Sequence, residues 1–303
     1  MEPASRLQAA LQRGEFVVTA EIVPPTGASA SPVREQALRL QGLVHAANVT
    51  ENPMATPHMS SLACCALLAQ HGIEPVLQLT GRDYNRVALQ SEALGASALG
   101  IHNVLCLTGD PPTVGRRPAG ELPFDLDATQ MLWILRRLRD EGRFLDGRHV
   151  SEAPRYFLGA AGSPNDPDPA HEALRLEKKI NAGAQFIQTQ LIFDVATFQR
   201  WLQALDKRGL LTRVHILAGI GLLHSVKTAR FLNERIPGVF VPPHLIQRLE
   251  QSPSHEETGL EIALELIQQV KALPEVSGIH IMSLGQESIL PRLLEQVELG
   301  TWA

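Results

Sequence analysis

Polar side chains recur near the ends of several apolar, strand-like segments of this chain. The segment 16–25 reads FVVTAEIVPP, and it carries one carboxylate, Glu21, shortly before Pro24 and Pro25 interrupt the run. A carboxylate near the end of a buried strand costs stability unless another group pairs with it or the protein uses it. Glu21 is therefore either paired within the fold or involved in chemistry.

Four further segments end in the same way. Side chains alternate between the two faces of a strand, so polar residues two positions apart share a face. The pairs are Thr19 and Glu21, Asn48 and Thr50, Gln78 and Thr80, Thr108 and Asp110, and Gln188 and Gln190. A polar residue at one strand end is commonly a turn cap, and Asp110 before two prolines can shape a turn. Five such ends on one sheet favour a polar binding site, although the pattern itself names no substrate.

Other catalytic motifs are absent from the sequence. The histidines form no HxH or HExxH spacing, and no metal site is predicted. His45, His215 and His280 lie in strand-like segments and are interpreted as structural residues. The glycine-containing segment 95–100, GASALG, follows a helical pattern rather than a strand, which excludes a dinucleotide-binding fingerprint there. No GxSxG motif indicates a serine hydrolase.

The elements that position these polar ends alternate along the whole chain. Strands that alternate with helices predict a parallel sheet, and eight such units in 303 residues predict a closed (β/α)8 TIM barrel. We expect one domain over 1–303 with a short N-terminal helix at about 3–13; an open doubly wound sheet is the alternative. The expected strands are 16–23, 43–50, 73–80, 103–108, 156–161, 185–191, 214–220 and 278–284. The expected later helices are 32–41, 58–71, 84–99, 126–141, 170–182, 194–208, 224–235, 243–250, 256–272 and 286–297.

Composition indicates a folded, reduced protein. Apolar residues make up 44% of the chain and charged residues 19%, which allows a sizeable core. The formal net charge of −5 gives no reason to expect a nucleic acid or an anionic membrane as partner. The N-terminus lacks the apolar stretch of a signal peptide, and Cys64, Cys65 and Cys106 have no metal-ligand spacing. We therefore expect a cytoplasmic protein.

Several segments carry a family resemblance. In order along the chain they are TAEIVPP (19–25), NVTEN (48–52), LQLTGRDYNR (77–86), GIHNVLCLTGDPP (100–112), EKKINAGAQFIQTQLIFD (177–194), AGIGLL (218–223) and GIHIMSL (278–284). Together, over about residues 15–285, they resemble the methylenetetrahydrofolate reductases, which are flavin-dependent (β/α)8 barrels. The shorter bacterial type of this family is the most similar in length.

The resemblance implies an activity and roles for three residues. The family uses FAD, with NADH or NADPH as reductant, to convert 5,10-methylenetetrahydrofolate into 5-methyltetrahydrofolate. Glu21 matches the general acid of the family, and Asp110 matches the aspartate that stabilises the iminium form of the substrate. Gln190 matches a glutamine that contacts folate, so Glu21, Asp110 and Gln190 are the expected substrate-binding residues.

The resemblance also implies a flavin site, in which some positions depart from the family pattern. The expected FAD-binding residues are Thr50, Gln78, Thr108, Gly109, Asp110, Ala160, Gly162, Asp166, Glu172 and Lys179. Gln78 stands where many members have His, and Thr108 stands where Arg is frequent. Thr228 and Leu232 stand where some members place Gln and Phe.

Two alternatives to this activity remain open at the level of sequence. One is a reductase of a related one-carbon pterin, or one that uses another electron donor. The other is a non-catalytic folate-binding or electron-relay subunit of a larger complex. We expect a homo-oligomer, with a partner subunit possible in the second case.

Overall fold

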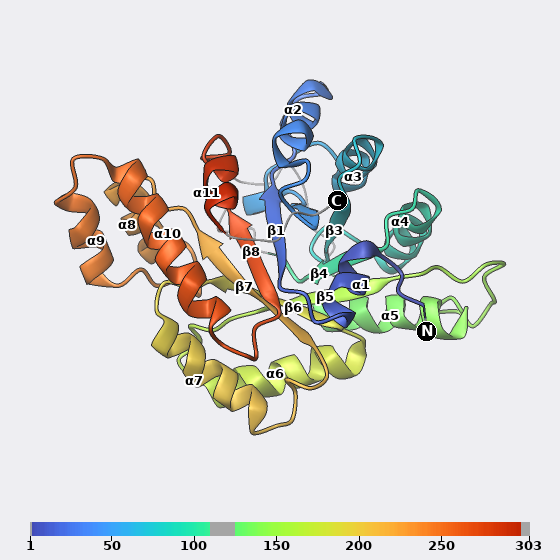
Figure 1. Cartoon of the computed structure of the whole chain (residues 1–303). Helices are drawn as coiled ribbons and strands as arrows, with labels where there is room; N and C mark the ends of the chain where they lie inside the picture. The colour runs from blue at the N-terminus through green and yellow to red at the C-terminus, as the bar shows by residue number, and fades with distance from the viewer. Residues whose placement is uncertain (1, 110–124, 298–303) are drawn as a thin grey trace.

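A closed barrel of parallel strands forms the centre of the molecule. The computed structural model describes residues 2–109 and 125–297. Each of the eight strands in this part pairs with the next, and β8 pairs with β1 to close the barrel. Figure 1 shows the helices packed around the outside of these strands. The predicted (β/α)8 barrel is confirmed, and the open sheet is excluded.

The elements occur in the predicted order, with every predicted strand present. The strands are β1 Val17–Ile22, β2 Ala46–Val49, β3 Pro75–Thr80, β4 Asn103–Leu107, β5 Phe157–Gly162, β6 Phe186–Leu191, β7 His215–Gly221 and β8 Gly278–Met282. The helices are α1 Arg6–Gln12, α2 Ser31–Leu40, η1 Pro53–Ala55, α3 Ser61–Gln70, α4 Arg86–Ala98, α5 Ala128–Glu141, α6 Pro169–Ala182, α7 Val195–Asp206, α8 Val226–Arg235, α9 Pro243–Glu250, α10 His255–Lys271 and α11 Leu290–Gln296. The short 3₁₀ turn η1 was not predicted.

Capping side chains define where several helices begin. Asn85, Asp127, Asp168 and Asp194 each accept hydrogen bonds from backbone N–H groups in the first turn of the following helix. These N–H groups have no partner within the helix, so a cap satisfies them and sets the start of the helix. The helices α4, α5, α6 and α7 therefore begin close to the carboxyl ends of the strands before them.

The two faces of the strands bury different cores. Residues on the outer face pack against the helices in one large apolar cluster. Residues near the amino ends of the strands fill the lumen in a second cluster, which includes the stacked rings of Phe157 and Phe186, with centroids 4.8 Å apart. The lumen is therefore apolar and filled at its amino end, and the polar strand ends lie at the opposite mouth.

Helix α1 closes the amino end of the barrel. Its apolar residues Leu7 and Leu11 belong to the cluster that fills the lumen. Glu74 holds the helix in place, because its carboxylate accepts hydrogen bonds from the backbone N–H groups of Arg6 and Leu7 at 2.9 and 2.8 Å. A carboxylate at a helix N-terminus also interacts favourably with the helix dipole.

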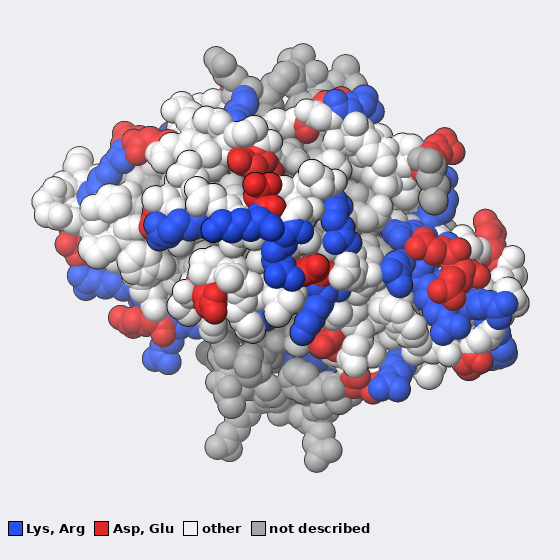
Figure 2. All heavy atoms as spheres, turned by 90° about the horizontal axis from the view of Figure 1, so that it is seen from below, with Lys and Arg blue, Asp and Glu red and all other residues white. Residues whose placement is uncertain are grey.

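The surface carries charges of both signs. On the face shown in Figure 2, basic side chains lie interspersed with acidic ones. Among the helices that the structure describes, none combines the length and apolar character needed to cross a membrane.

Candidate active site

A reciprocal pair of amides forms the floor of the polar half of the lumen. The Nδ2 group of Asn48 on β2 donates to Oε1 of Gln188 on β6 at 2.6 Å, and Nε2 of Gln188 donates to Oδ1 of Asn48 at 3.0 Å. Both side chains are buried. Because each amide donates to and accepts from the other, the pair satisfies buried polar groups that would otherwise destabilise the barrel.

Glu21 lies above this floor beside a histidine of β8. The Oε2 atom of Glu21 is 3.9 Å from Nε2 of His280, and the Glu21 side chain keeps 24% of its surface exposed. Thr19 Oγ1 lies 2.9 Å from Nδ1 of His280 and also donates to the carbonyl of Ile279 at 3.3 Å. The contact with Thr19 at Nδ1 fixes the orientation of the His280 ring. Nε2 of His280 therefore faces the carboxyl group of Glu21.

His280 also lines the cavity at the carboxyl ends of the strands, together with Glu21. The sequence interpretation of this histidine as structural accounts for its contact with Thr19 but not for its position beside Glu21. Strand alternation could have indicated this position from the sequence, because it places Gly278, His280 and Met282 on one face of their strand.

A cavity of about 530 Å³ opens at the carboxyl ends of the strands. It brings together most of the residues that the sequence singled out. Those that line it are Glu21, Thr50, Gln78, Thr108, Gly109, Gly162, Lys179 and Gln190. Asp110 lies outside the described residues. Ala160, Asp166 and Glu172 do not line the cavity.

The strand β5 turns a different alanine toward the cavity from the one expected. Ala160 is fully buried in the outer core, and Ala161 lines the cavity in its place. The two residues differ by one position, and neighbours along a strand point to opposite faces.

Strand β6 breaks the alternation altogether. Its pairing with β7 shifts register between Gln188 and Leu191, and the consecutive residues Gln188, Thr189 and Gln190 all line the cavity. An extra residue in one strand redirects side chains in this way. The hydroxyl of Thr189 accepts a hydrogen bond from the backbone N–H of Gly219 at 2.8 Å, which holds the irregular segment against β7.

Two cations of α6 face the cavity one helical turn apart. Lys179 donates from Nζ to the carbonyl of Ala161 at 2.8 Å, and Arg175 lies 3.2 Å from the carboxylate of Glu172. Burial lowers the pKa of Lys179, an effect that the charge of Glu172 opposes. Burial also raises the pKa of Glu172, whose carboxylate accepts the backbone N–H of Ser163 at 3.0 Å. The sequence reasoning missed Arg175, which its spacing of four residues from Lys179 could have indicated.

Asp166 and Glu172 act on the cavity indirectly. Asp166 accepts a hydrogen bond from the backbone N–H of Asp168 at 2.9 Å and lies 3.9 Å from Arg175. Both carboxylates therefore orient Arg175, and the arginine is the group that reaches the cavity.

Glu51 is a second carboxylate at the mouth that sequence reasoning missed. It accepts hydrogen bonds from the Tyr84 hydroxyl at 2.7 Å, the Ser61 hydroxyl at 3.0 Å and the backbone N–H of Thr80 at 2.6 Å. Burial raises the pKa of Glu51 to about 7, although these hydrogen bonds oppose the shift. Glu51 is the second residue after the end of β2, where strand alternation no longer predicts a direction.

The segment after β2 holds an unusual backbone conformation. Asn52, Met54 and Ala55 have φ angles of 40°, 54° and 53°, in the left-handed region that favours glycine. The guanidinium of buried Arg82 donates to the carbonyl of Asn52 at 3.0 Å, and Nδ2 of Asn52 donates to Asp83 at 3.1 Å. Non-glycine residues persist in this region when their surroundings hold them, and such positions cluster at functional sites.

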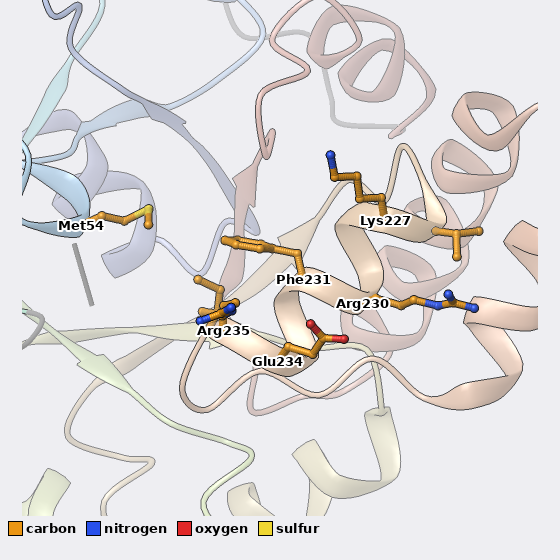
Figure 3. Close-up of a pocket in the computed structure, with 8 residues that line it drawn as sticks. Met54, Lys227, Arg230, Phe231, Glu234 and Arg235 are labelled. Atoms are coloured by element: carbon orange, nitrogen blue, oxygen red, sulfur yellow. The ribbon is translucent and has the colours of Figure 1, made fainter. Parts of the chain in front are cut away.

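Two positions of α8 that the sequence compared with the family lie away from the mouth cavity. Leu232 is buried in the outer core, and the Thr228 hydroxyl lies 2.8 Å from Nε2 of His224. The neighbouring side chain of Phe231 is 43% exposed. Figure 3 shows its ring directed from α8 toward Met54 of η1.

Comparison with known proteins identifies the family. The model of the family described as methylenetetrahydrofolate reductase matches residues 6–298. The chain belongs to this family. It is 25% identical over 252 residues to a probable methylenetetrahydrofolate reductase (NADPH) of Caenorhabditis elegans, which covers 80% of this chain and 35% of that protein. It is 24% identical over 227 residues to a 5,10-methylenetetrahydrofolate reductase of Pectobacterium carotovorum subsp. carotovorum, covering 72% of this chain and 67% of that protein.

The chain thus spans about a third of the length of the nematode relative. Among solved structures, a protein of Clostridium thermocellum described as binding two copies of 5-methyl-5,6,7,8-tetrahydrofolic acid is similar in fold. Its TM-score is 0.71 at 15% identity, and the match covers 97% of this chain and 99% of that one.

Proposed function

We propose that this protein reduces 5,10-methylenetetrahydrofolate to 5-methyltetrahydrofolate with FAD as cofactor and NADH or NADPH as reductant. The observation that carries the proposal is the placement of Glu21, Gln190 and Lys179 around one polar cavity in a chain of the methylenetetrahydrofolate reductase family. The matching names of the relatives from Caenorhabditis elegans and Pectobacterium support the same reaction.

The residues of the mouth fit a flavin nucleotide in two respects. The hydroxyl oxygen of Thr50 is buried and has no hydrogen-bond partner among the described residues, so it is free to bond a ligand. Arg175 and Lys179 supply positive charge to one wall of the cavity, as the phosphates of a dinucleotide require. We assign Thr50, Gln78, Thr108, Gly109, Gly162 and Lys179 to direct flavin contacts, and Ala161 and Arg175 join them.

Hydride transfer, from NADH or NADPH to the one-carbon unit of the folate, is the chemistry that bound FAD would supply. The remaining requirement is a proton. The five-membered ring of the substrate opens when the bond between its methylene carbon and N10 breaks, and N10 must then be protonated. The carboxyl group of Glu21 supplies this proton, and the ring opens to a 5-iminium cation.

His280 and Thr19 prepare Glu21 for this step. Nε2 of His280 lies 3.9 Å from the carboxyl group of Glu21, and the Thr19 hydroxyl beside Nδ1 keeps the ring in that orientation. We assign His280 a positioning role and Glu21 the role of general acid.

Gln190 and Asp110 complete the proposed substrate site. The side chain of Gln190 lines the cavity, and its Oε1 accepts the backbone N–H of Leu191 at 2.9 Å, which leaves its Nε2 group to donate to a pterin. Asp110 follows Gly109 and supplies the negative charge that would stabilise the iminium cation. Its role rests on the sequence motif.

A spectroscopic experiment tests the proposal. The purified protein is mixed with FAD, and its visible spectrum is followed as NADH or NADPH and then 5,10-methylenetetrahydrofolate are added. We expect a flavin spectrum that bleaches with the reductant and recovers with the folate. Failure to bind FAD, or reduced flavin that the folate does not reoxidise, would refute the proposal and favour a different donor or a folate-binding subunit.

A further inference from the structure

Glu51 joins four segments of the chain at the edge of the mouth cavity. It follows the end of β2 and lines the cavity. Its Oε2 atom accepts the backbone N–H of Thr80 at the end of β3. Its Oε1 atom lies 3.0 Å from the hydroxyl of Ser61 in α3 and 2.7 Å from the hydroxyl of Tyr84, which precedes α4. The proton transfer assigned to Glu21 makes no use of this second carboxyl group.

The hydrogen bonds around Glu51 suit a neutral carboxyl group. The Ser61 hydroxyl lies within hydrogen-bond distance of two acceptors, Oε1 of Glu51 at 3.0 Å and the carbonyl oxygen of Gln78 at 3.2 Å. A hydroxyl has one hydrogen, so an ionised Glu51 and this carbonyl compete for it. A protonated Oε1 can instead donate to the Ser61 oxygen, and the Ser61 hydrogen is then left for the carbonyl of Gln78. Oε2 remains the acceptor for the N–H of Thr80 at 2.6 Å.

The charges around Glu51 act in the same direction. Burial is the main reason why the pKa of Glu51 rises to about 7, and the charge of Asp83 adds to this rise. The guanidinium of Arg82 is paired with Asp83 at 2.8 Å. The cations of α6 lie between β5 and β6, across the closed barrel from β2. The other titratable groups of the surrounding elements are Glu21 of β1, His58 of the segment after η1, Cys64 and Cys65 of α3, Glu92 of α4, Arg175 and Lys179 of α6 and His280 of β8.

A ligand bound to Thr50 would lie next to Glu51. Thr50 directly precedes Glu51, and both residues line the cavity. The Thr50 hydroxyl oxygen is buried and has no hydrogen-bond partner within the described part of the chain, which makes it available to a ligand. A ligand at this place displaces water from the carboxyl group of Glu51, and the loss of water disfavours the ionised form.

We propose that Glu51 belongs to the cofactor site and that FAD binds with Glu51 protonated, so that one proton from solvent enters the site with the cofactor. The inference rests on the proposed function. FAD removes water from the cavity and brings the negative charge of its phosphates into it, and both effects favour the neutral carboxyl group. The proton stays on Oε1, between the hydroxyl oxygens of Ser61 and Tyr84, and takes part in no bond making or breaking of the reaction.

Calorimetric titration of the flavin-free full chain with FAD tests the proposal. Repeating the titration in buffers that differ in their enthalpy of ionisation counts the protons taken up. Because the pKa of free Glu51 is about 7, wild type should take up more than about half a proton per FAD at about pH 7.5. Its affinity for FAD should fall about tenfold from about pH 6.5 to about pH 8.5. In Glu51→Gln the amide cannot titrate, so the uptake and most of this fall should disappear.

Glu92→Gln serves as the matched control. Burial also raises the pKa of Glu92, which lies on α4 and is not among the described residues that line the cavity. This variant should take up as many protons as wild type.

Tyr84→Phe provides a second test that leaves Glu51 in place. The hydrogen bond from Tyr84 lowers the pKa of Glu51, so its removal should raise this pKa. The pH range over which FAD binding takes up a proton should therefore move upward. This measurement decides the matter even if Glu51→Gln does not fold.

Four results would count against the proposal. FAD binding to wild type without proton uptake would overturn the inference alone. Uptake that persists in Glu51→Gln would do the same and assign the proton to another group of the site, such as Lys179. A pH range of uptake that Tyr84→Phe does not move would also overturn the inference. Absence of FAD binding to wild type would overturn the proposed function, and the inference with it.

Discussion

Substitution of Glu51 by Gln should change how the stability of this barrel depends on pH. The pKa of Glu51 is about 7 in the folded protein, against 4.5 for an ordinary glutamate, because burial disfavours its charge. Between these two values the folded chain holds a proton that the unfolded chain has lost. The free energy of unfolding therefore falls as pH rises through this window, and it becomes level above about pH 7.

The size of the effect follows from the two pKa values. From about pH 5.5 to about pH 8, the contribution of Glu51 to the free energy of unfolding decreases by about 2 kcal/mol. The glutamine introduced by Glu51→Gln would not titrate, and its amide can still accept from the Thr80 N–H and donate to the hydroxyl oxygens of Tyr84 and Ser61. The free energy of unfolding of the variant, measured relative to that of wild type, should therefore rise by about 2 kcal/mol from about pH 5.5 to about pH 8.

Urea unfolding of both proteins at the two pH values measures this difference. The half-buried residues His45 and His215 have pKa values lowered by desolvation and act in the opposite direction, but they do so in both proteins and cancel in the comparison. A difference between variant and wild type that stays constant from about pH 5.5 to about pH 8 would refute the reasoning.

Three further substitutions test separate parts of the structure. Gly109→Ala should destabilise the protein by about 1–3 kcal/mol in urea unfolding. Gly109 has a φ of 94°, and an added Cβ would lie 2.5 Å from Cγ2 of Thr80. Unchanged stability would show that this backbone can relax. Asn48→Leu should lower the free energy of unfolding by about 1–3 kcal/mol, because it leaves the Gln188 amide without its partner. Adding Gln188→Leu should recover part of this loss. Additive losses in the same assay would argue against the amide pair. Glu74→Ala should lower the free energy of unfolding by about 1–3 kcal/mol and speed hydrogen exchange in α1, because the carboxylate accepts from the backbone of that helix. Unaltered exchange in α1 would mean that Glu74 does not anchor the helix.

The barrel could be predicted because its local patterns agree with one another. Short apolar runs alternate with amphipathic stretches, and all eight strands appear within three residues of their predicted ends. Alternation along strands also explains why Glu21, Thr50 and Gln78 reach one cavity.

The prediction was incomplete where the chain departs from regular alternation. Ala160 was chosen in place of Ala161, since a one-residue difference in register reverses the face of a side chain. The irregular pairing of β6 adds Thr189 to the cavity, and Glu51 enters it from beyond the end of a strand. The left-handed residues at Asn52 and Met54 had no glycine to mark them. These positions are determined by contacts between distant parts of the chain, such as the hydrogen bond from Arg82 to Asn52.

The role of Glu21 as general acid is the central claim of the proposed mechanism, and separate measurement of the two half-reactions in Glu21→Gln tests it most directly. Gln cannot donate the proton that opens the folate ring, so stopped-flow absorbance should show flavin reduction by NADH or NADPH at a rate near that of wild type. Reoxidation by 5,10-methylenetetrahydrofolate should fall by at least about 100-fold. Glu287→Gln, which alters a carboxylate that accepts the Ser283 hydroxyl outside the cavity, should retain both rates. Undiminished reoxidation in Glu21→Gln would contradict the assignment of Glu21 as the acid.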